Sequence, residues 1–295
     1  FSAPGRKLLS INIHGYDAQK HGALPLVSDA GVALEKIGAA LGSKRFADPD
    51  FAARDKWFKT TDALFAAPKG NELPTDAQVI GAVDRVSGKT SVIMSAAGTM
   101  PGALHVLWRA AQGGYHMEYG FSCMGYELAG AMGIKMALPQ RDVICMIGDG
   151  SYMLANSELA TAVMMGIPFT VVLTDNRGYG CINRLQAATG GAPFNNLLRD
   201  SYHVNEANLD FVAHARSMGA HAVKVGTIAH LEAALKDAKS ATIPTVIVID
   251  TDPLPGTGAG GTWWDVAVPE VSDRKEVNEA RKGYETGTRA QWLLN

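Results

Sequence analysis

Apolar runs and segments with helical periodicity alternate along the chain between residues 76 and 252. Short apolar runs that predict buried strands cover residues 91–94, 143–147, 169–173, 221–225 and 245–249. Segments that predict helices cover residues 76–86, 158–165, 211–218 and 228–240. This alternation of strand and helix predicts an α/β fold with a doubly wound parallel sheet.

The amino-terminal part of the chain has a separate pattern. Residues 7–13 read as a strand and residues 29–41 as a helix. A unit of about 40 residues is too small to fold alone. We therefore interpret residues 1–45 as the end of a middle domain, and residues 46–75 as a helical linker.

The carboxy-terminal part begins with a segment rich in glycine and proline, which predicts a flexible linker. Residues 76–253 would form the main domain, and residues 254–295 would follow it. The adjacent Trp263 and Trp264 indicate either a docked tail or a lid over a site.

Loops are predicted next to several strands. Small residues predict a loop over 95–102, where Thr99 either contacts a phosphate or belongs to a tight connection. Residues 113–119 and the polar segment 183–202 also read as loops. A helix within residues 120–138 carries small residues whose spacing favours close packing, namely Gly125, Gly130 and Gly133.

Candidate chemistry is concentrated between residues 144 and 180. Asp149 follows one predicted strand and Asn176 follows the next, and the carboxyl ends of parallel strands meet at one edge of a sheet. Their oxygens are the hard ligands that Mg²⁺ prefers. Gly150 and Ser151 place backbone N–H groups at a helix start, which favours a diphosphate. An Asp that caps a helix and an Asn in a turn is the competing interpretation.

The composition excludes two classes of function. The chain has 295 residues, of which 47% are hydrophobic and 19% charged, and its net charge is −2. Without a run of Lys or Arg, this balance argues against nucleic acid as the main partner. No apolar stretch reaches the roughly 18 residues of a membrane span. The 3 cysteines form no pattern, and we expect a reduced, cytoplasmic protein.

Four segments carry a resemblance to a known family, namely EYGFSCMGYELAG, GDGSYMLANSELATAVMMG, DNRGYGCINRLQ and GGTWWDVAVPEVS. With them, the chain resembles the carboxy-terminal part of thiamine diphosphate (ThDP) enzymes of the acetolactate synthase and pyruvate decarboxylase type. The resemblance implies that residues 1–45 end the family's middle domain. It also implies that residues 76–253 form the domain that binds the diphosphate and Mg²⁺.

The resemblance implies roles for individual residues. Asp149, the Asn176 side chain and the Gly178 carbonyl would bind Mg²⁺. Asp175 stands where the family usually has Asn, and we interpret it as a structural or charge-tuning variant. Met124 would hold ThDP in its bent form. The residues implied to contact ThDP are Thr99, Ser122, Met124, Gly148, Gly150, Ser151, Asn176 and Gly178.

The resemblance also implies a partner. The family's catalytic Glu lies in a pyrimidine-binding domain of a neighbouring subunit, so we expect this chain to form half of a site. An amino-terminal half would supply the other part, within a homodimer or homotetramer. Candidate proton-transfer or hydroxyl-binding residues in this chain are His116, Glu118 and Glu127.

The likeness is strongest to family members of inositol catabolism. It implies hydrolysis of a carbon–carbon bond in a polyhydroxy cyclic 1,2-diketone, which would yield 5-deoxyglucuronate. One alternative is carboligation of 2-oxo acids, as in acetolactate synthase, with Arg177 or Arg184 as the carboxylate-binding group. Another is a non-catalytic ThDP-binding or regulatory subunit.

Overall fold

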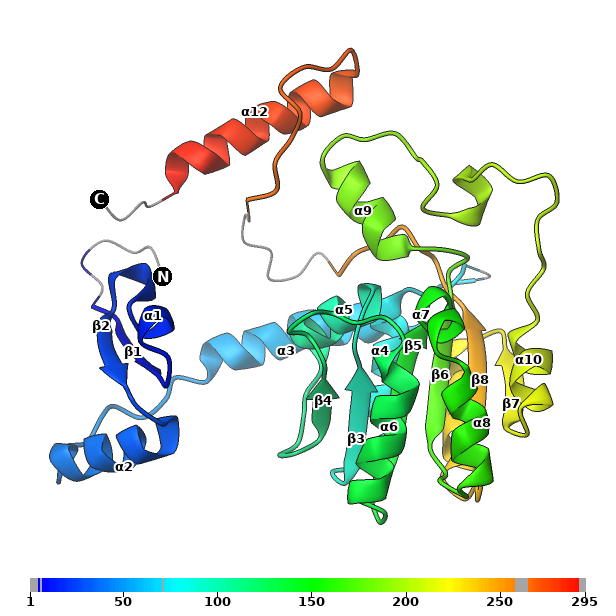
Figure 1. Cartoon of the computed structure of the whole chain (residues 1–295), viewed down its shortest axis with the longest axis horizontal. Helices are drawn as coiled ribbons and strands as arrows, with labels where there is room; N and C mark the ends of the chain where they lie inside the picture. The colour runs from blue at the N-terminus through cyan, green and yellow to red at the C-terminus, as the bar shows by residue number, and fades with distance from the viewer. Residues whose placement is uncertain (1–4, 6, 71, 258–264, 292–295) are drawn as a thin grey trace.

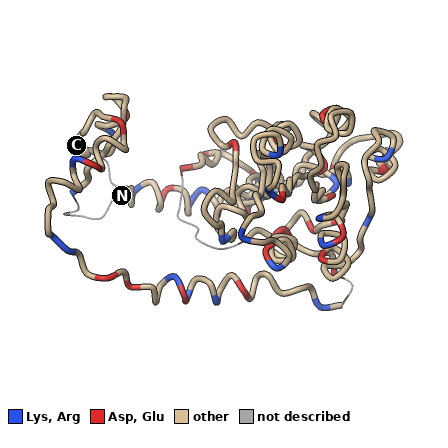
Figure 2. The backbone as a smooth tube through the Cα atoms, turned by 90° about the horizontal axis from the view of Figure 1, so that it is seen from below, with Lys and Arg blue, Asp and Glu red and all other residues tan. Residues whose placement is uncertain are grey.

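The computed structural model describes residues 5, 7–70, 72–257 and 265–291 (Figure 1). The predictions for Trp263 and Trp264 fall outside the described residues. No helix of the described segments is long and apolar enough to cross a membrane. Lys and Arg residues are interspersed with Asp and Glu residues along the backbone (Figure 2).

The centre of the molecule is a 6-stranded parallel sheet with the order β4-β3-β5-β6-β8-β7 (Figure 1). The predicted doubly wound parallel sheet is therefore confirmed. Its strands are β3 (Ser91–Ser95), β4 (Tyr115–Met117), β5 (Asp142–Gly148), β6 (Thr170–Asp175), β7 (His221–Val225) and β8 (Thr245–Asp250). Strand β3 pairs with β4 on one side and β5 on the other, so the chain changes direction across the sheet between β4 and β5.

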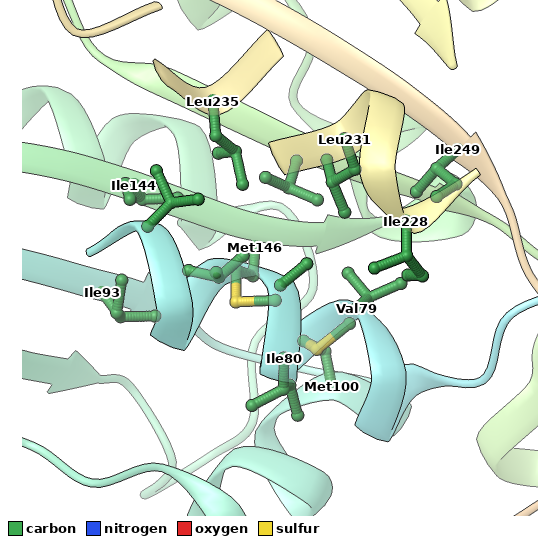
Figure 3. Packing of buried hydrophobic residues seen from close by; sticks show 14 of the residues in the cluster. Val79, Ile80, Ile93, Met100, Ile144, Met146, Ile228, Leu231, Leu235 and Ile249 are labelled. Atoms are coloured by element: carbon green, nitrogen blue, oxygen red, sulfur yellow. The ribbon is translucent and has the colours of Figure 1, made fainter. Parts of the chain in front are cut away.

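One face of the sheet is covered by α4 (Asp76–Val86), α5 (Thr99–Leu107) and α11 (Ile228–Ala238). Ile144 and Met146 of β5 lie in one buried cluster with Ile80 of α4 and Leu231 of α11 (Figure 3). Burial of each large apolar side chain contributes about 1.5–3 kcal/mol to stability. This cluster packs α4, α5 and α11 against the central strands of the sheet.

The opposite face is covered by α6 (Tyr126–Ala137), α7 (Asp149–Leu154), α8 (Ser157–Met164) and α10 (Phe211–Ser217). Val143, Cys145 and Ile147 alternate with the residues above and belong to a second buried cluster with Leu128 and Leu159. Strand β5 is apolar at consecutive positions because both of its faces are buried.

Local sequence explains where several helices begin. In α4, the Thr75 hydroxyl accepts the Gln78 N–H at 3.4 Å, and the Gln78 side chain accepts the Thr75 N–H at 2.9 Å. This reciprocal capping satisfies two donors that a helix start otherwise leaves open. A single side chain accepts a backbone N–H at the start of three more helices, in which the capping residues are Asp29, Asp210 and Thr227.

The amino-terminal segments lie apart from the central sheet (Figure 1). They comprise β1 (Leu9–Asn12), α1 (Gly15–Ala18), a 3₁₀ turn (Lys20–Gly22), β2 (Leu24–Val27) and α2 (Ala30–Leu41). Strands β1 and β2 pair in parallel. Helix α3 (Ala52–Phe65) connects this unit to the central sheet and packs on α4.

The carboxy-terminal helix α12 (Lys275–Ala290) follows the sheet and contacts the loop after α9 (Gly180–Ala188). Arg274 donates a hydrogen bond to the Gly190 carbonyl at 2.7 Å. A Cβ at Gly190 would lie 2.4 Å from the backbone of Glu276, so only glycine permits this approach. A second 3₁₀ turn covers Leu198–Asp200.

Three predicted loops were wrong in part. Strand β3 extends to Ser95 and α5 begins at Thr99, because Pro101 is compatible with the first turn of a helix. Strand β4 lies inside the predicted loop 113–119. Helix α9 occupies the beginning of the predicted loop 183–202, where polar residues obscured its apolar side.

The predicted close packing by glycines is only partly correct. A Cβ at Gly130 would lie 2.8 Å from the Met94 side chain of β3, so Gly130 does permit close approach to the sheet. Gly125, directly before α6, lies near the end of α7, where a Cβ would meet the Ala155 side chain at 3.1 Å. Gly133 has no neighbouring atom within 4 Å, because it faces away from the sheet.

Candidate active site

A cavity of about 310 Å³ lies at the carboxyl ends of β3, β5 and β6. Its position is next to the point where the order of strands reverses, which is where open α/β sheets bind ligands. All of the residues predicted to contact the cofactor or the metal ion line this cavity, namely Thr99, Ser122, Met124, Gly148, Asp149, Gly150, Ser151, Asn176 and Gly178. Residues far apart in the sequence thus meet in one place.

Two buried oxygens at one end of the cavity have no hydrogen-bond partner. Asp149 Oδ2 accepts the Gly178 N–H at 3.0 Å, whereas Asp149 Oδ1 and Asn176 Oδ1 remain without a partner. Buried polar atoms are normally satisfied, and a hard cation would satisfy these two. This donor set therefore fits Mg²⁺.

The remaining ligands of such a cation would not come from a cluster of acids. Within the described segments, no group of three or more His, Cys, Asp and Glu side chains could hold a metal ion. Mg²⁺ is commonly held by one or two protein oxygens together with phosphate oxygens and water. The mixed set of Asp149, Asn176 and a backbone carbonyl agrees with that chemistry.

Burial, together with the nearby charge of Asp175, raises the pKa of Asp149 to about 7. Asp175 is itself buried, and its carboxylate accepts the Arg177 N–H at 3.1 Å, which holds the turn after β6. The residue therefore has both a structural contact and an electrostatic effect on Asp149. A cation beside Asp149 would act in the opposite direction and favour its charged form.

The turn that carries Gly178 requires glycine. Its φ of 149° lies in a region that other residues rarely adopt, and a Cβ would lie 2.4 Å from the Asn196 carbonyl. Opposite this turn, a Cβ at Gly150 would lie 2.8 Å from the Tyr179 ring. Gly178 therefore allows the segment at Asn196 to approach the turn after β6, and Gly150 allows Tyr179 to approach the beginning of α7.

The segment before α6 is ordered by Glu118. Its carboxylate accepts the Phe121 N–H at 3.1 Å and the Cys123 N–H at 2.8 Å. The hydrogen bonds from Cys123 and Phe121 lower the pKa of Glu118. They close a loop in which Ser122, two residues before Met124, adopts a left-handed conformation with φ of 53°.

The three predicted proton-transfer residues are not among the residues that line the cavity. The Glu118 carboxylate accepts hydrogen bonds from the backbone of its own loop. The exposed His116 stacks on Tyr126, with ring centroids 6.1 Å apart and a hydrogen bond of 3.3 Å. Glu127 is buried behind the cavity wall, and burial raises its pKa. Direct proton transfer by these groups stays a prediction.

One wall of the cavity was not predicted from the sequence. Helix α9 and the residue before it supply Tyr179, Cys181, Ile182 and Leu185. Cys181 and Ile182 lie four and three residues before Leu185, which is helical spacing that could have revealed the helix. Tyr119 adds a further ring to the lining.

Neither arginine considered for a carboxylate ligand lines the cavity. Arg177 forms an ion pair with Glu206 outside it. Arg184 donates hydrogen bonds to the carbonyls of Pro253 at 3.0 Å and Pro255 at 3.2 Å. Both guanidinium groups therefore stabilise connections around the site.

Comparison with known protein families gives one match over about half of the chain. A family described as "Thiamine pyrophosphate enzyme, C-terminal TPP binding domain" matches residues 96–249. Thiamine pyrophosphate is another name for ThDP. The matched region runs from the end of β3 to β8 and includes every residue predicted to bind the cofactor.

Curated relatives are similar over nearly the whole chain. The 3D-(3,5/4)-trihydroxycyclohexane-1,2-dione hydrolase of Geobacillus thermodenitrificans is 34% identical, over 93% of this chain and 48% of the relative. The protein of the same name from Bacillus licheniformis is 35% identical, over 97% of this chain and 49% of the relative. The chain thus spans about half the length of the curated relatives it matches.

A solved structure has the same fold. The thiamine diphosphate-dependent 4-hydroxybenzoylformate decarboxylase of Rhodococcus jostii RHA1 aligns with a TM-score of 0.67 and 22% identity. The alignment covers 84% of this chain and 44% of that protein. At this identity the likeness concerns the architecture alone.

Proposed function

Because this chain belongs to the thiamine pyrophosphate enzymes, we propose that it is the cofactor-binding part of a ThDP- and Mg²⁺-dependent hydrolase. The proposed substrate is 3D-(3,5/4)-trihydroxycyclohexane-1,2-dione, whose ring is opened to 5-deoxyglucuronate in the degradation of myo-inositol. The names of relatives that are 34–35% identical support this choice of substrate. They also favour an enzyme over a non-catalytic subunit.

The observation that carries the proposal is the pair of partnerless oxygens within a cavity that also collects the predicted cofactor contacts. We propose that Asp149, Asn176 and the Gly178 carbonyl hold Mg²⁺. Gly150, Ser151 and Thr99 would bind the diphosphate. When bound, ThDP supplies a nucleophilic carbon for addition to a carbonyl group and an electron sink for carbon–carbon cleavage.

Met124 has a proposed role in orienting the cofactor. Its methyl group lies 3.5 Å from the position of a Cβ on Gly150, so it reaches toward the proposed diphosphate site from the opposite wall. A half-buried, adaptable side chain at this point can fill the bend of a folded cofactor. The Ser122 carbonyl would orient the cofactor's amino group.

The domain boundaries belong to the same proposal. Residues 76–253 would bind the cofactor, and residues 1–45 would end a middle domain that residues 46–75 connect to it. Residues 254–295 would act as a tail or lid, in line with the contact of Arg274 with Gly190. An amino-terminal half would complete the site within a homodimer or homotetramer.

Hydrolysis in isotopically labelled water tests the proposal. The assembled enzyme, with ThDP and Mg²⁺, should convert the cyclic diketone to an acid that contains one oxygen from water. Mass spectrometry of the product measures this oxygen, and removal of Mg²⁺ by a chelator should stop its formation. Condensation of 2-oxo acids with loss of carbon dioxide, and no reaction of the diketone, would overturn the assignment.

A further inference from the structure

The carboxylate of Glu127 is fully buried at the beginning of α6, directly behind the cavity wall. One oxygen accepts the Ala97 N–H at 3.1 Å and the other accepts the Gly125 N–H at 2.9 Å. The Ser151 hydroxyl forms a hydrogen bond with the same group. In the described part of the chain, no cationic side chain forms an ion pair with Glu127.

Each partner of Glu127 belongs to a different segment of the cavity lining. Ala97 lies in the cavity wall after β3 and precedes Thr99. Gly125 directly follows Met124, and Ser151 lies on the wall after β5. One carboxylate therefore connects three segments at positions beyond the backbone pairing of the strands.

Burial of a carboxylate without a counter-ion is costly, and an apolar residue would avoid that cost. Only a carboxylate, however, offers two acceptor oxygens and no competing donor. The Ala97 and Gly125 N–H groups come from separate loops and each donates to a different oxygen, so both side-chain oxygens must be acceptors. The choice of Glu at this position is thus explained by the two loops that its oxygens hold in place.

We propose that Glu127 is a positioning residue, which fixes the segments at Ala97, Gly125 and Ser151 so that the cavity is shaped for its cofactor before binding. The inference rests on the proposed function, because it takes ThDP with Mg²⁺ as the ligand. It assigns Glu127 an indirect role through Thr99, Met124 and Ser151.

The test uses Glu127→Gln in the assembled enzyme. The amide has the same size, but its NH₂ group must face one of the two backbone N–H groups. Before ThDP is added, peptides that contain Ala97 or Gly125 should exchange their amide hydrogens faster than in the wild type. With Mg²⁺ present, calorimetry should then show ThDP affinity reduced at least about tenfold, since preorganisation is lost.

Ser95→Ala is the matched control. The Ser95 side chain is also fully buried, and its hydroxyl donates to the Met146 carbonyl at 3.0 Å, but it does not line the cavity. Its loss should lower the melting temperature and leave ThDP affinity unchanged. Equal affinity losses in both variants, or none in Glu127→Gln, would overturn the positioning role.

Two further outcomes keep the inference separate from the proposed function. If Glu127→Gln does not fold, amide exchange and ThDP affinity are measured for Glu127→Asp instead and compared with Ser95→Ala. This variant keeps both oxygens but places them on a shorter side chain. If the wild-type enzyme does not bind ThDP, the proposed function fails. Amide exchange at Ala97 and Gly125 would still support or overturn the connecting role of Glu127.

Discussion

At the scale of single residues, the proposed metal site depends most on Asp149. Asp149→Ala should abolish Mg²⁺-dependent ThDP binding, because it removes a hard ligand and leaves the diphosphate charge uncompensated. Calorimetric titration of the assembled enzyme measures the loss. Asp142→Ala, at the other end of β5, removes only a 3.0 Å hydrogen bond with Ser91 and should bind ThDP normally. Unchanged affinity in Asp149→Ala would refute the metal assignment.

Met124 gives a different expectation, because its proposed role concerns the reacting atoms. Met124→Ala should reduce kcat and the C2 hydrogen–deuterium exchange of bound ThDP by on the order of 10²-fold, the effect of a displacement of about 1 Å. Affinity for ThDP should change much less, since the diphosphate contacts remain.

Met146→Ala is the control for Met124. Met146 is fully buried in the core cluster of Figure 3, so its truncation should cost roughly 2–5 kcal/mol of stability. Exchange at C2 should stay normal in the protein that folds. If Met124→Ala behaves in the same way, Met124 is a core residue and not a support for the cofactor.

Glu118 predicts a pH dependence. Hydrogen bonds from Cys123 and Phe121 lower its pKa in the folded protein. Its contribution to loop order is therefore complete above the ordinary pKa of Glu, and it is lost as pH falls through the lowered value. The amide chemical shifts of Cys123 and Phe121 should titrate together at that lower pH and become flat in Glu118→Gln. A midpoint at the ordinary value of about 4.3 would contradict the hydrogen bonds.

The residues that would bind a metal ion and a phosphate could be predicted from the sequence, but the hydrogen-bond partners of individual side chains could not. Asp149 and Asn176 follow predicted strands, so their meeting in one cavity followed from the rule for parallel sheets. The role of Glu127 depends on backbone N–H groups from two loops. Sequence patterns do not place such groups, and the residue therefore read as a possible proton-transfer group.

At the scale of elements, two glycines distinguish close packing from open helix surface. A Cβ on Gly81 of α4 would lie 2.6 Å from the Phe65 side chain, where α3 meets α4. Gly81→Ala should destabilise the protein by about 1–3 kcal/mol, as overpacking does. Gly133→Ala in α6 meets no atom within 4 Å and should stabilise it by about 0.5–1 kcal/mol. Urea unfolding measures both, and equal signs would contradict the packing.

Strands were easier to predict than the elements around the cavity. Strands such as β5 and β6 are nearly continuous apolar runs, because both of their faces are buried. Helices α5 and α9 instead have one side on the core or cavity and small or polar residues elsewhere. Segments that line a ligand site have to contact the ligand as well as the core. Their hydrophobic periodicity is therefore weaker.

At the scale of the whole molecule, the described lining of the cavity includes a single acid, Asp149, which the proposed metal ion would bind. The proposed function calls for a second carboxylic acid at the cofactor's pyrimidine ring, which we propose comes from an amino-terminal half. We expect the 295-residue chain alone to be inactive, and activity to return with an amino-terminal half. Turnover of the cyclic diketone by this chain alone would disprove this.

The two kinds of wall in the cavity have an evolutionary consequence. The wall at β5 and β6 is constrained by glycines without room for a side chain, as at Gly178. The wall from α9 consists of side chains such as Ile182 and Leu185, which stand outside both core clusters. Mutations at these two positions of α9 can therefore accumulate without loss of the fold or of the proposed diphosphate site. New substrate preferences in a lineage of such proteins should arise first at these two positions.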